Sequence, residues 1–324
     1  MPTIAIEEHF VTPAFVAGPG KGFLDRFRKS GPRGALIAER LSDLGNKRIA
    51  EMDAAGIDMQ VLSLNSPGVE QAEPAEAIAC ARDANDFLAE AIRRHPTRFA
   101  GFAALPIQAP AEAAAELERC VRTLGFKGAN INGHTRGRYL DEAAFAPILA
   151  RAEALDVPIY LHPTVPHKPV ADALYGGLPP VSSATLAASA FGWHIETAIH
   201  LLRLILAGVF DRHPKLQVVI GHMGESLPFM LPRLNRTLPT QLTALARPVA
   251  DYLRQNVHYT FGGFNFTPTF LNLLLEVGVD RIMFSADYPY GEMEEAKSFL
   301  RHIPVSETDR ERIAHGNAKR LLRL

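Results

Sequence analysis

The chain has 324 residues, of which 47% are hydrophobic and 21% charged, and its formal net charge is −1. This balance can build a large buried core, and the scattered lysines and arginines exclude a basic nucleic-acid-binding patch. Neither a membrane span nor a signal peptide is recognisable, and two cysteines exclude a disulfide framework, so we expect a cytoplasmic globular protein with a small-molecule partner, no nucleic acid and no membrane.

In chain order, short apolar or β-branched runs alternate with longer amphipathic runs, which is typical of βα units around a parallel sheet. The eight strand-like runs are Thr3 to Glu7, Asp58 to Leu64, Phe99 to Leu105, Gly128 to Asn132, Val157 to His162, Leu216 to His222, Asn256 to Phe261 and Arg281 to Asp287. Helix-like runs between them include Ala75 to Arg94, Ala111 to Thr123, Glu142 to Leu155 and Glu307 to Leu322. We predict an α/β fold: a single (β/α)8 TIM barrel forming one domain over residues 1–324.

Two connections are unusually long. They run from Val11 to Asn46 after the first strand and from Pro163 to Phe191 after the fifth. Both follow the carboxyl ends of strands, the face where such barrels keep their active sites, and long ordered loops there are often lids or interfaces. We therefore expect these two loops to roof a pocket.

Polar side chains end several of the predicted strands. Glu7 and His9 end the first, His162 the fifth and Asp287 the eighth. A barrel gathers its strand ends around one mouth, so these residues can converge within metal-ligand distance, and the two-residue spacing turns Glu7 and His9 to the same face. Two imidazoles and two carboxylates suit one Zn²⁺ or Mn²⁺ ion. A second metal would need a bridging group, and the fourth strand offers only Lys127, near its start.

His222 ends the sixth strand within Gly-His-Met-Gly-Glu, where flanking glycines allow close backbone approach. We interpret His222 as a proton shuttle or orienting group and Glu225 as its partner. A satisfied core histidine is the alternative for His222, and compensation of a helix dipole is the alternative for Glu225.

Weaker candidates lie elsewhere. Asn132 ends the fourth strand and could donate a hydrogen bond to substrate, although asparagine is also an ordinary turn residue. Arg233 or Arg236 could clamp a substrate carboxylate, with a solvated helix face or a subunit interface as the alternative. We interpret His194 and His200, in an amphipathic helix, as packing or interface residues.

These motifs together resemble the decarboxylase branch of the amidohydrolase superfamily. The chain is most similar to the γ-resorcylate and 2,3-dihydroxybenzoate decarboxylases, and more distantly to aminocarboxymuconate semialdehyde decarboxylase. The motifs that carry the resemblance are Glu7-Glu8-His9-Phe10, Tyr160-Leu161-His162-Pro163, Gly221-His222-Met223-Gly224-Glu225 and Phe284-Ser285-Ala286-Asp287-Tyr288-Pro289. The resemblance implies a metal held at Glu7, His9, His162 and Asp287, His222 beside the substrate, and a homodimer or homotetramer.

Two segments depart from the pattern of the resorcylate enzymes. The chain has Thr164-Val165-Pro166 where they carry Arg-Asn-Pro, and Thr260-Phe261-Gly262-Gly263 where they carry Thr-Ser-Gly. Both segments line the mouth of the expected pocket, so they bear on the substrate more than on the metal or the fold.

The resemblance implies a metal-dependent, non-oxidative decarboxylation of a hydroxybenzoate-type acid. The metal would hold the carboxylate and the ortho-hydroxyl, Asp287 would protonate the ring carbon, and His222 with Glu225 would orient or recharge the proton donor. We expect one divalent metal ion and no organic cofactor, since no motif for one is visible. Two alternatives stay open: a hydrolase such as a lactonase or amidohydrolase that uses a metal-activated water, and a non-catalytic barrel.

Overall fold

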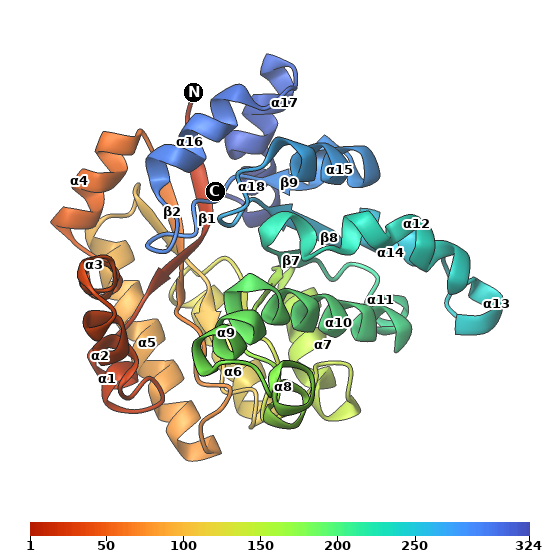
Figure 1. Ribbon diagram of the computed structural model, residues 1–324, viewed down its shortest axis with the longest axis horizontal. Coiled ribbons are helices and arrows are strands. Elements are labelled where there is room, and N and C mark those ends of the chain that lie inside the picture. Colours follow the sequence, from red (N-terminus) through yellow and green to blue (C-terminus); the bar gives the residue numbers. More distant parts are fainter.

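Parallel strands occupy the centre of the molecule and helices surround them (Figure 1), in a computed structural model that describes all of residues 1–324. Three strands form one sheet in the order β1 (Ile4–Phe10), β2 (Met59–Leu64) and β3 (Phe99–Gly101). Six form the other in the order β4 (Ala103–Ala104), β5 (Ala129–Asn132), β6 (Ile159–His162), β7 (Val218–Ile220), β8 (Val257–Thr260) and β9 (Ile282–Met283). All neighbouring strands pair in parallel.

The two sheets are joined at both ends. Only Phe102 separates β3 from β4, and its N–H donates to Leu62 O at 2.9 Å while the next N–H donates to Gly128 O at 2.9 Å. The third predicted strand therefore passes from one sheet into the other. On the far side, Ile6 N–H donates to Phe284 O at 3.0 Å, which ties β1 to the segment after β9. Each of the eight predicted runs overlaps an observed strand, as expected from their apolar, β-branched sequences; β1 continues three residues beyond its predicted end.

Most predicted helices lie within two residues of their expected bounds, for example α5 (Pro74–Arg94) and α6 (Pro110–Arg122). The last predicted helix is divided by a π-helical turn into three pieces. The other helices, with short 3-10 or π turns labelled η, are α4 (Asn46–Ala55), η1 (Ala143–Phe145), α7 (Ala146–Leu155), α10 (Gly192–Leu206), α11 (Val209–Arg212), η3 (His222–Gly224), α12 (Leu227–Thr237), α13 (Thr240–Thr243), α14 (Val249–Gln255), α15 (Thr267–Val277), η4 (Val279–Arg281), α16 (Met293–His302), α17 (Glu307–Glu311), η5 (Arg312–Gly316) and α18 (Asn317–Leu322). None of the helices has the length and apolar character needed to cross a bilayer.

The two long connections, predicted as loops, contain short helices. The first holds α1 (Pro13–Ala17), α2 (Phe23–Lys29) and α3 (Pro32–Ser42), and the second holds α8 (Lys168–Tyr175), α9 (Pro180–Thr185) and η2 (Leu186–Ala190). Proline opens three of these helices at the position where its missing N–H costs nothing. The Thr12 hydroxyl caps α1 by accepting from Phe15 N–H at 3.1 Å.

The buried side chains form two groups. A small cluster enclosed by the strands includes Ile4, Ile6, Tyr160 and Met283, whereas Ala5 belongs to a much larger cluster that includes residues of the surrounding helices. The start of β1 therefore alternates regularly, with its isoleucines turned inward.

Candidate active site

A β-bulge at Glu7 reverses the alternation of β1. The register with β2 shifts between Ile6 and Glu8, and Glu7 has a φ of +90°. Without this extra residue, the inward-facing Ile4 and Ile6 would send Glu7 and His9 outward, because side chains alternate with a period of two. The bulge instead places both on the inner side. The prediction that they share a face is thus confirmed, through a backbone irregularity that the sequence did not reveal.

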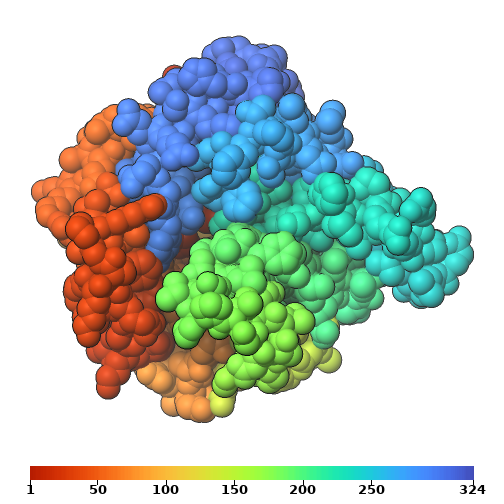
Figure 2. Space-filling model, in the orientation of Figure 1, coloured from red at the N-terminus to blue at the C-terminus, as the bar shows by residue number.

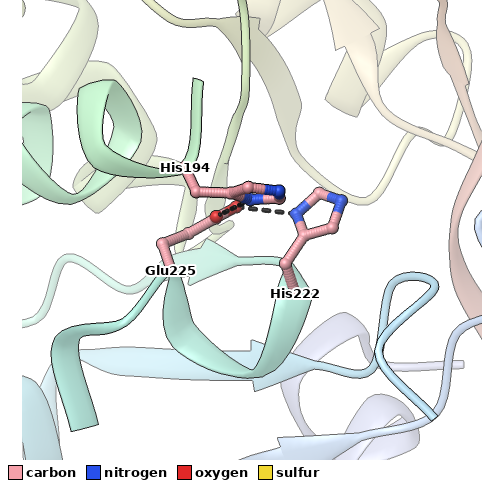
Figure 3. Close-up of side chains that lie close together, drawn as sticks. All are labelled: His194, His222 and Glu225. Atoms are coloured by element: carbon pink, nitrogen blue, oxygen red, sulfur yellow. Dashed lines mark hydrogen bonds and ion pairs between the residues drawn. The ribbon is translucent and has the colours of Figure 1, made fainter. Parts of the chain in front are cut away.

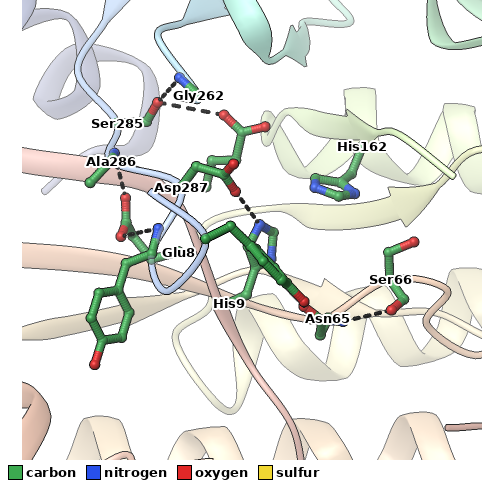
Figure 4. Close-up of polar contacts among 12 residues, drawn as sticks. Glu8, His9, Asn65, Ser66, His162, Gly262, Ser285, Ala286 and Asp287 are labelled. Atoms are coloured by element: carbon green, nitrogen blue, oxygen red, sulfur yellow. Dashed lines mark hydrogen bonds and ion pairs between the residues drawn. The ribbon is translucent and has the colours of Figure 1, made fainter. Parts of the chain in front are cut away.

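Three of the predicted metal ligands, His9, His162 and Asp287, come together at the carboxyl ends of the strands (Figure 4), and Glu7 lies near the charge of Asp287. His9 Nε2 lies 3.2 Å from Asp287 Oδ1, and the His9 and His162 rings are 4.8 Å apart between centroids in an edge-on arrangement. Residues from the two ends of the chain therefore meet in one site.

Glu7 lies in a tight cradle with one free oxygen. Thr260 Oγ1 donates to Glu7 Oε2 at 2.7 Å, whereas buried Oε1 accepts no hydrogen bond. Gly221 and Gly262 press against this carboxylate, and a Cβ on either would collide with it. Burial raises the pKa of Glu7; the charge of nearby His222 opposes that rise, and the charge of Asp287 adds to it. Its nearest cation is His222, whose Nδ1 lies 3.7 Å from Oε1. A buried carboxylate with an oxygen that accepts no hydrogen bond and a like charge nearby is a position that a divalent cation would stabilise.

His162 presents one nitrogen for coordination. Its Nδ1 lies 2.9 Å from Pro163 O, and since a carbonyl can only accept, Nδ1 carries the proton and Nε2 keeps its lone pair. Burial lowers the pKa of His162 well below its usual range, and the positive charges of His9 and His222 lower it further. The imidazole is therefore neutral, as a metal ligand must be.

The segment from His222 to Ser226 is a left-handed turn. All five of its residues have positive φ, including 51° at His222 and 54° at Glu225. Glu7 and Asp287 also have positive φ, so four of the ten non-glycine residues in this region of backbone space are predicted site residues. Such conformations cost roughly 1–3 kcal/mol each and gather where surrounding structure holds functional groups in place.

This turn joins His222 and Glu225 to a third side chain, His194 of α10 (Figure 3). His222 Nδ1 lies 2.7 Å from Glu225 Oε1, and His194 Nδ1 lies 2.5 Å from Glu225 Oε2. The predicted contact between His222 and Glu225 is present. Glu225 does not cap the dipole of α12, because its two oxygens face the two imidazoles. The interpretation of His194 as a packing residue is wrong, since the fold brings α10 over the sixth strand end.

The proton positions in this triad follow from its neighbours. Trp193 Nε1–H can only donate, and it lies 3.1 Å from His194 Nε2, which must then accept. His194 Nδ1 therefore carries a proton and donates to Glu225. The 3.2 Å contact of His194 Nε2 with Ser189 O is then not a hydrogen bond, because Nε2 has no proton to donate. A His194–His222–Glu225 metal site is conceivable, since the ligand atoms lie within 4.8 Å of one another. We favour the hydrogen-bonded triad, because a metal would have to displace both protons.

The triad also controls the charge of His222. Burial lowers the pKa of His222, but the charges of Glu225 and Glu7 and the hydrogen bond to Glu225 together raise it to about 10. Burial raises the pKa of Glu225, and the charge of His222 with the two imidazole hydrogen bonds more than reverses this. His222 is therefore a cation whose Nε2 makes no hydrogen bond within the protein. A cation held at Glu7 would lower the pKa of His222 again.

Glu8, on the outer side of the bulge, positions Asp287. Its carboxylate accepts hydrogen bonds from Ala286 N–H at 2.8 Å and Tyr288 N–H at 3.2 Å, on either side of Asp287 (Figure 4). It also accepts from Gln60 Nε2 at 3.2 Å. This role of Glu8 was not predicted from the sequence. The available signal was its position between Glu7 and His9: if those two face inward, Glu8 faces outward, where a buried carboxylate needs partners.

A cavity of about 750 Å³ opens above the site. His162, His222 and Asp287 line it, and both long connections contribute to its walls. In Figure 2 the N-terminal segment in red and the segment near residue 180 in green face each other across this side of the molecule. Arg26 and Arg33 also line it, and neither has a carboxylate within 4.0 Å. Two uncompensated guanidinium groups favour an anionic substrate.

The two predicted substrate-binding residues do not line this cavity. Asn132 is buried beside Glu70, which accepts from its backbone N–H at 2.6 Å. Arg233 is exposed on α12. Within one chain neither reaches the cavity, so their roles stay predictions, and that of Arg233 would need a second subunit.

Loss of His194 should weaken the triad without unfolding the protein. In His194→Phe, Glu225 loses the hydrogen bond that it accepts from His194. Such a bond to a charged acceptor contributes about 1.5–3 kcal/mol. We expect kcat to fall about tenfold or more, with little change in KM. The nuclear magnetic resonance titration of His222 should move to higher pH, because the less satisfied carboxylate holds the imidazolium more strongly.

His213→Phe is the matched control, since His213 Nδ1 also pairs with a glutamate, Glu153, at 3.0 Å but lies outside the cavity. Equal losses in both variants would show that the effect is only structural.

Comparison with known proteins agrees with this geometry. Residues 9–324 match the family model described as amidohydrolase. The γ-resorcylate decarboxylase of Polaromonas sp. strain JS666 is 40% identical over 334 aligned residues, covering 99% of this chain and 98% of the relative.

Two solved structures illustrate the similarity. A dihydroxybenzoic acid decarboxylase from Polaromonas sp. JS666, with bound manganese and the inhibitor 2-nitroresorcinol, has a TM-score of 0.90 at 38% identity, covering 100% of this chain and 97% of the other. The 5-carboxyvanillate decarboxylase of Novosphingobium aromaticivorans, complexed with manganese and 4-hydroxy-3-methoxy-5-nitrobenzoic acid, has a TM-score of 0.91 at 36% identity, covering 100% and 96%.

Proposed function

This chain belongs to the amidohydrolase family, and from that membership we propose that it is a carboxy-lyase that decarboxylates a hydroxybenzoate-type aromatic acid without oxidation and with the help of a divalent metal ion. The observation that carries the proposal is the position of Asp287, which contacts His9 and also lines the cavity. The relatives named above are decarboxylases, which favours this reaction over hydrolysis. The presence of all four predicted metal-ligand residues argues against a non-catalytic protein.

In the proposed reaction, each residue of the site has a separate role. A divalent ion, Mn²⁺ or Zn²⁺, held by Glu7, His9, His162 and Asp287 would supply positive charge for the substrate's carboxylate and ortho-hydroxyl. Asp287 delivers a proton to the ring carbon that bears the carboxylate. The bond to the carboxylate then breaks, its electron pair returns to the ring, and CO2 leaves. His222 Nε2, free of protein partners and open to the cavity, returns a proton to Asp287, while Glu225 and His194 hold His222 in place.

We also propose that residues 1–324 form one closed (β/α)8 barrel, supported by the hydrogen bonds that join the two sheets at both ends. A homodimer or homotetramer, in which Arg233 could serve a neighbouring cavity, and a cytoplasmic location stay predictions.

Purified protein loaded with Mn²⁺ should release CO2 from one or more 2-hydroxybenzoates and form the corresponding phenols. The measurement is CO2 release together with chromatographic detection of the phenol, with lactones and amides assayed in parallel. Hydrolysis of a lactone or amide with no CO2 from any hydroxybenzoate would reverse the assignment.

A further inference from the structure

We propose that the substrate carries an apolar substituent, beyond its hydroxybenzoate ring, that lies against a wall formed by Phe23, Phe27, Ile37 and Val165. This inference rests on the proposed function, because it assumes that the ring binds beside Asp287. It concerns the part of the cavity that the proposed chemistry leaves empty.

The cavity is too large for a single substituted ring. A water molecule occupies about 30 Å³, and a bonded heavy atom needs no more than that. A dihydroxybenzoate has eleven heavy atoms and so fills less than about half of the 750 Å³. Cavities of roughly 300–1,000 Å³ usually bury most of the surface of a drug-sized ligand, which is larger than one substituted ring. Space for a substituent therefore remains when the ring is bound.

Aromatic rings mark the direction in which this space extends. The Tyr290 ring lies 5.8 Å from the His9 ring and 5.9 Å from the Phe27 ring, measured between centroids. The Phe27 ring is in turn 5.0 Å from that of Phe23. This line of rings leads from a predicted metal ligand to the far wall, through three steps of 5 to 6 Å. A ring bound beside Asp287 would therefore reach Phe27 and Phe23 only through a substituent that follows these contacts.

The four side chains of this wall are apolar, and they come from both long connections. Phe23, Phe27 and Ile37 come from the first long connection, and Val165 comes from the second. Val165 is 47% exposed in the isolated chain although it lines the cavity. None of these four side chains can hydrogen-bond, so water against them is readily displaced by an alkyl or aryl group. Arg26 and Arg33 line the same cavity, but these four side chains themselves offer no partner to a polar substituent.

The test uses 2-hydroxybenzoates that carry n-alkyl chains of one, three or five carbons at each ring position from 3 to 6. Binding to the Mn²⁺-loaded protein is measured by calorimetry, and CO2 release is measured separately. Burial of one methylene contributes about 0.8 kcal/mol, which converts to roughly fourfold in affinity. We expect affinity to rise about fourfold per methylene at one ring position.

Val165→Asn should reduce this gain per methylene at least about twofold, because the chain then faces an amide. Leu275→Asn is the matched control: Leu275 is 83% exposed on α15 and does not line the cavity, so the gain should be unchanged. Affinity that stays flat with chain length at every ring position would overturn the inference, and so would a gain that Val165→Asn leaves intact. A gain in affinity without CO2 release from any acid would instead refute the decarboxylase proposal alone.

Discussion

Asp287→Asn is expected to lower the rate of CO2 release by about 10³-fold or more while the protein stays folded, since general acids contribute roughly 10² to 10⁴-fold. The asparagine keeps the size and an oxygen near His9, 3.2 Å away in the native site, but it cannot donate a proton from a carboxyl group. The variant should also lose exchange of the product phenol's ring hydrogen in D2O. That exchange requires the same proton transfer but no CO2.

The control separates proton transfer from metal binding. Asp172→Asn makes the same change at an exposed helix position paired only with Lys168, and it should leave the rate unchanged. Metal content of Asp287→Asn is measured by elemental analysis. If the variant keeps its metal and retains a tenth of the native rate, Asp287 is not the proton donor.

Removal of the metal is expected to abolish activity and to lower thermal stability, and added Mn²⁺ should restore both. The metal-free site leaves Glu7 Oε1 buried without a hydrogen bond and near the charge of Asp287. A ligand present at 1,000 times its Kd stabilises the folded state by about 4 kcal/mol. Unfolding curves recorded with chelator and with excess Mn²⁺ measure this difference.

Two variants decide which donor set holds the metal. Glu7→Gln should lose most of the metal-dependent stabilisation, whereas His194→Phe should keep it, because His194 belongs to the hydrogen-bonded triad. The reverse result would place the ion at His194, His222 and Glu225 and would refute the predicted ligands.

The order of strands and the position of chemical groups at their ends could be read from the sequence. Apolar, β-branched runs specify strands locally, and polar residues such as His162 and Asp287 at their carboxyl ends stand out against those runs. The convergence of Glu7, His9, His162 and Asp287 then follows from any arrangement that gathers parallel strand ends. The short helices of the long connections were missed, because helices of so few residues depend on tertiary packing more than on their own sequence.

Only the tertiary structure decided how these groups face one another. The alternation of Ile4 and Ile6 would have turned Glu7 outward, and a single-residue bulge reverses it. From the sequence, His194 is an amphipathic-helix residue. Packing of α10 against the turn after β7 instead places its Nδ1 in hydrogen-bond contact with Glu225 Oε2. Local sequence sets the period of a strand or helix, whereas bulges, left-handed turns and contacts between distant elements depend on the energy of the whole packed molecule.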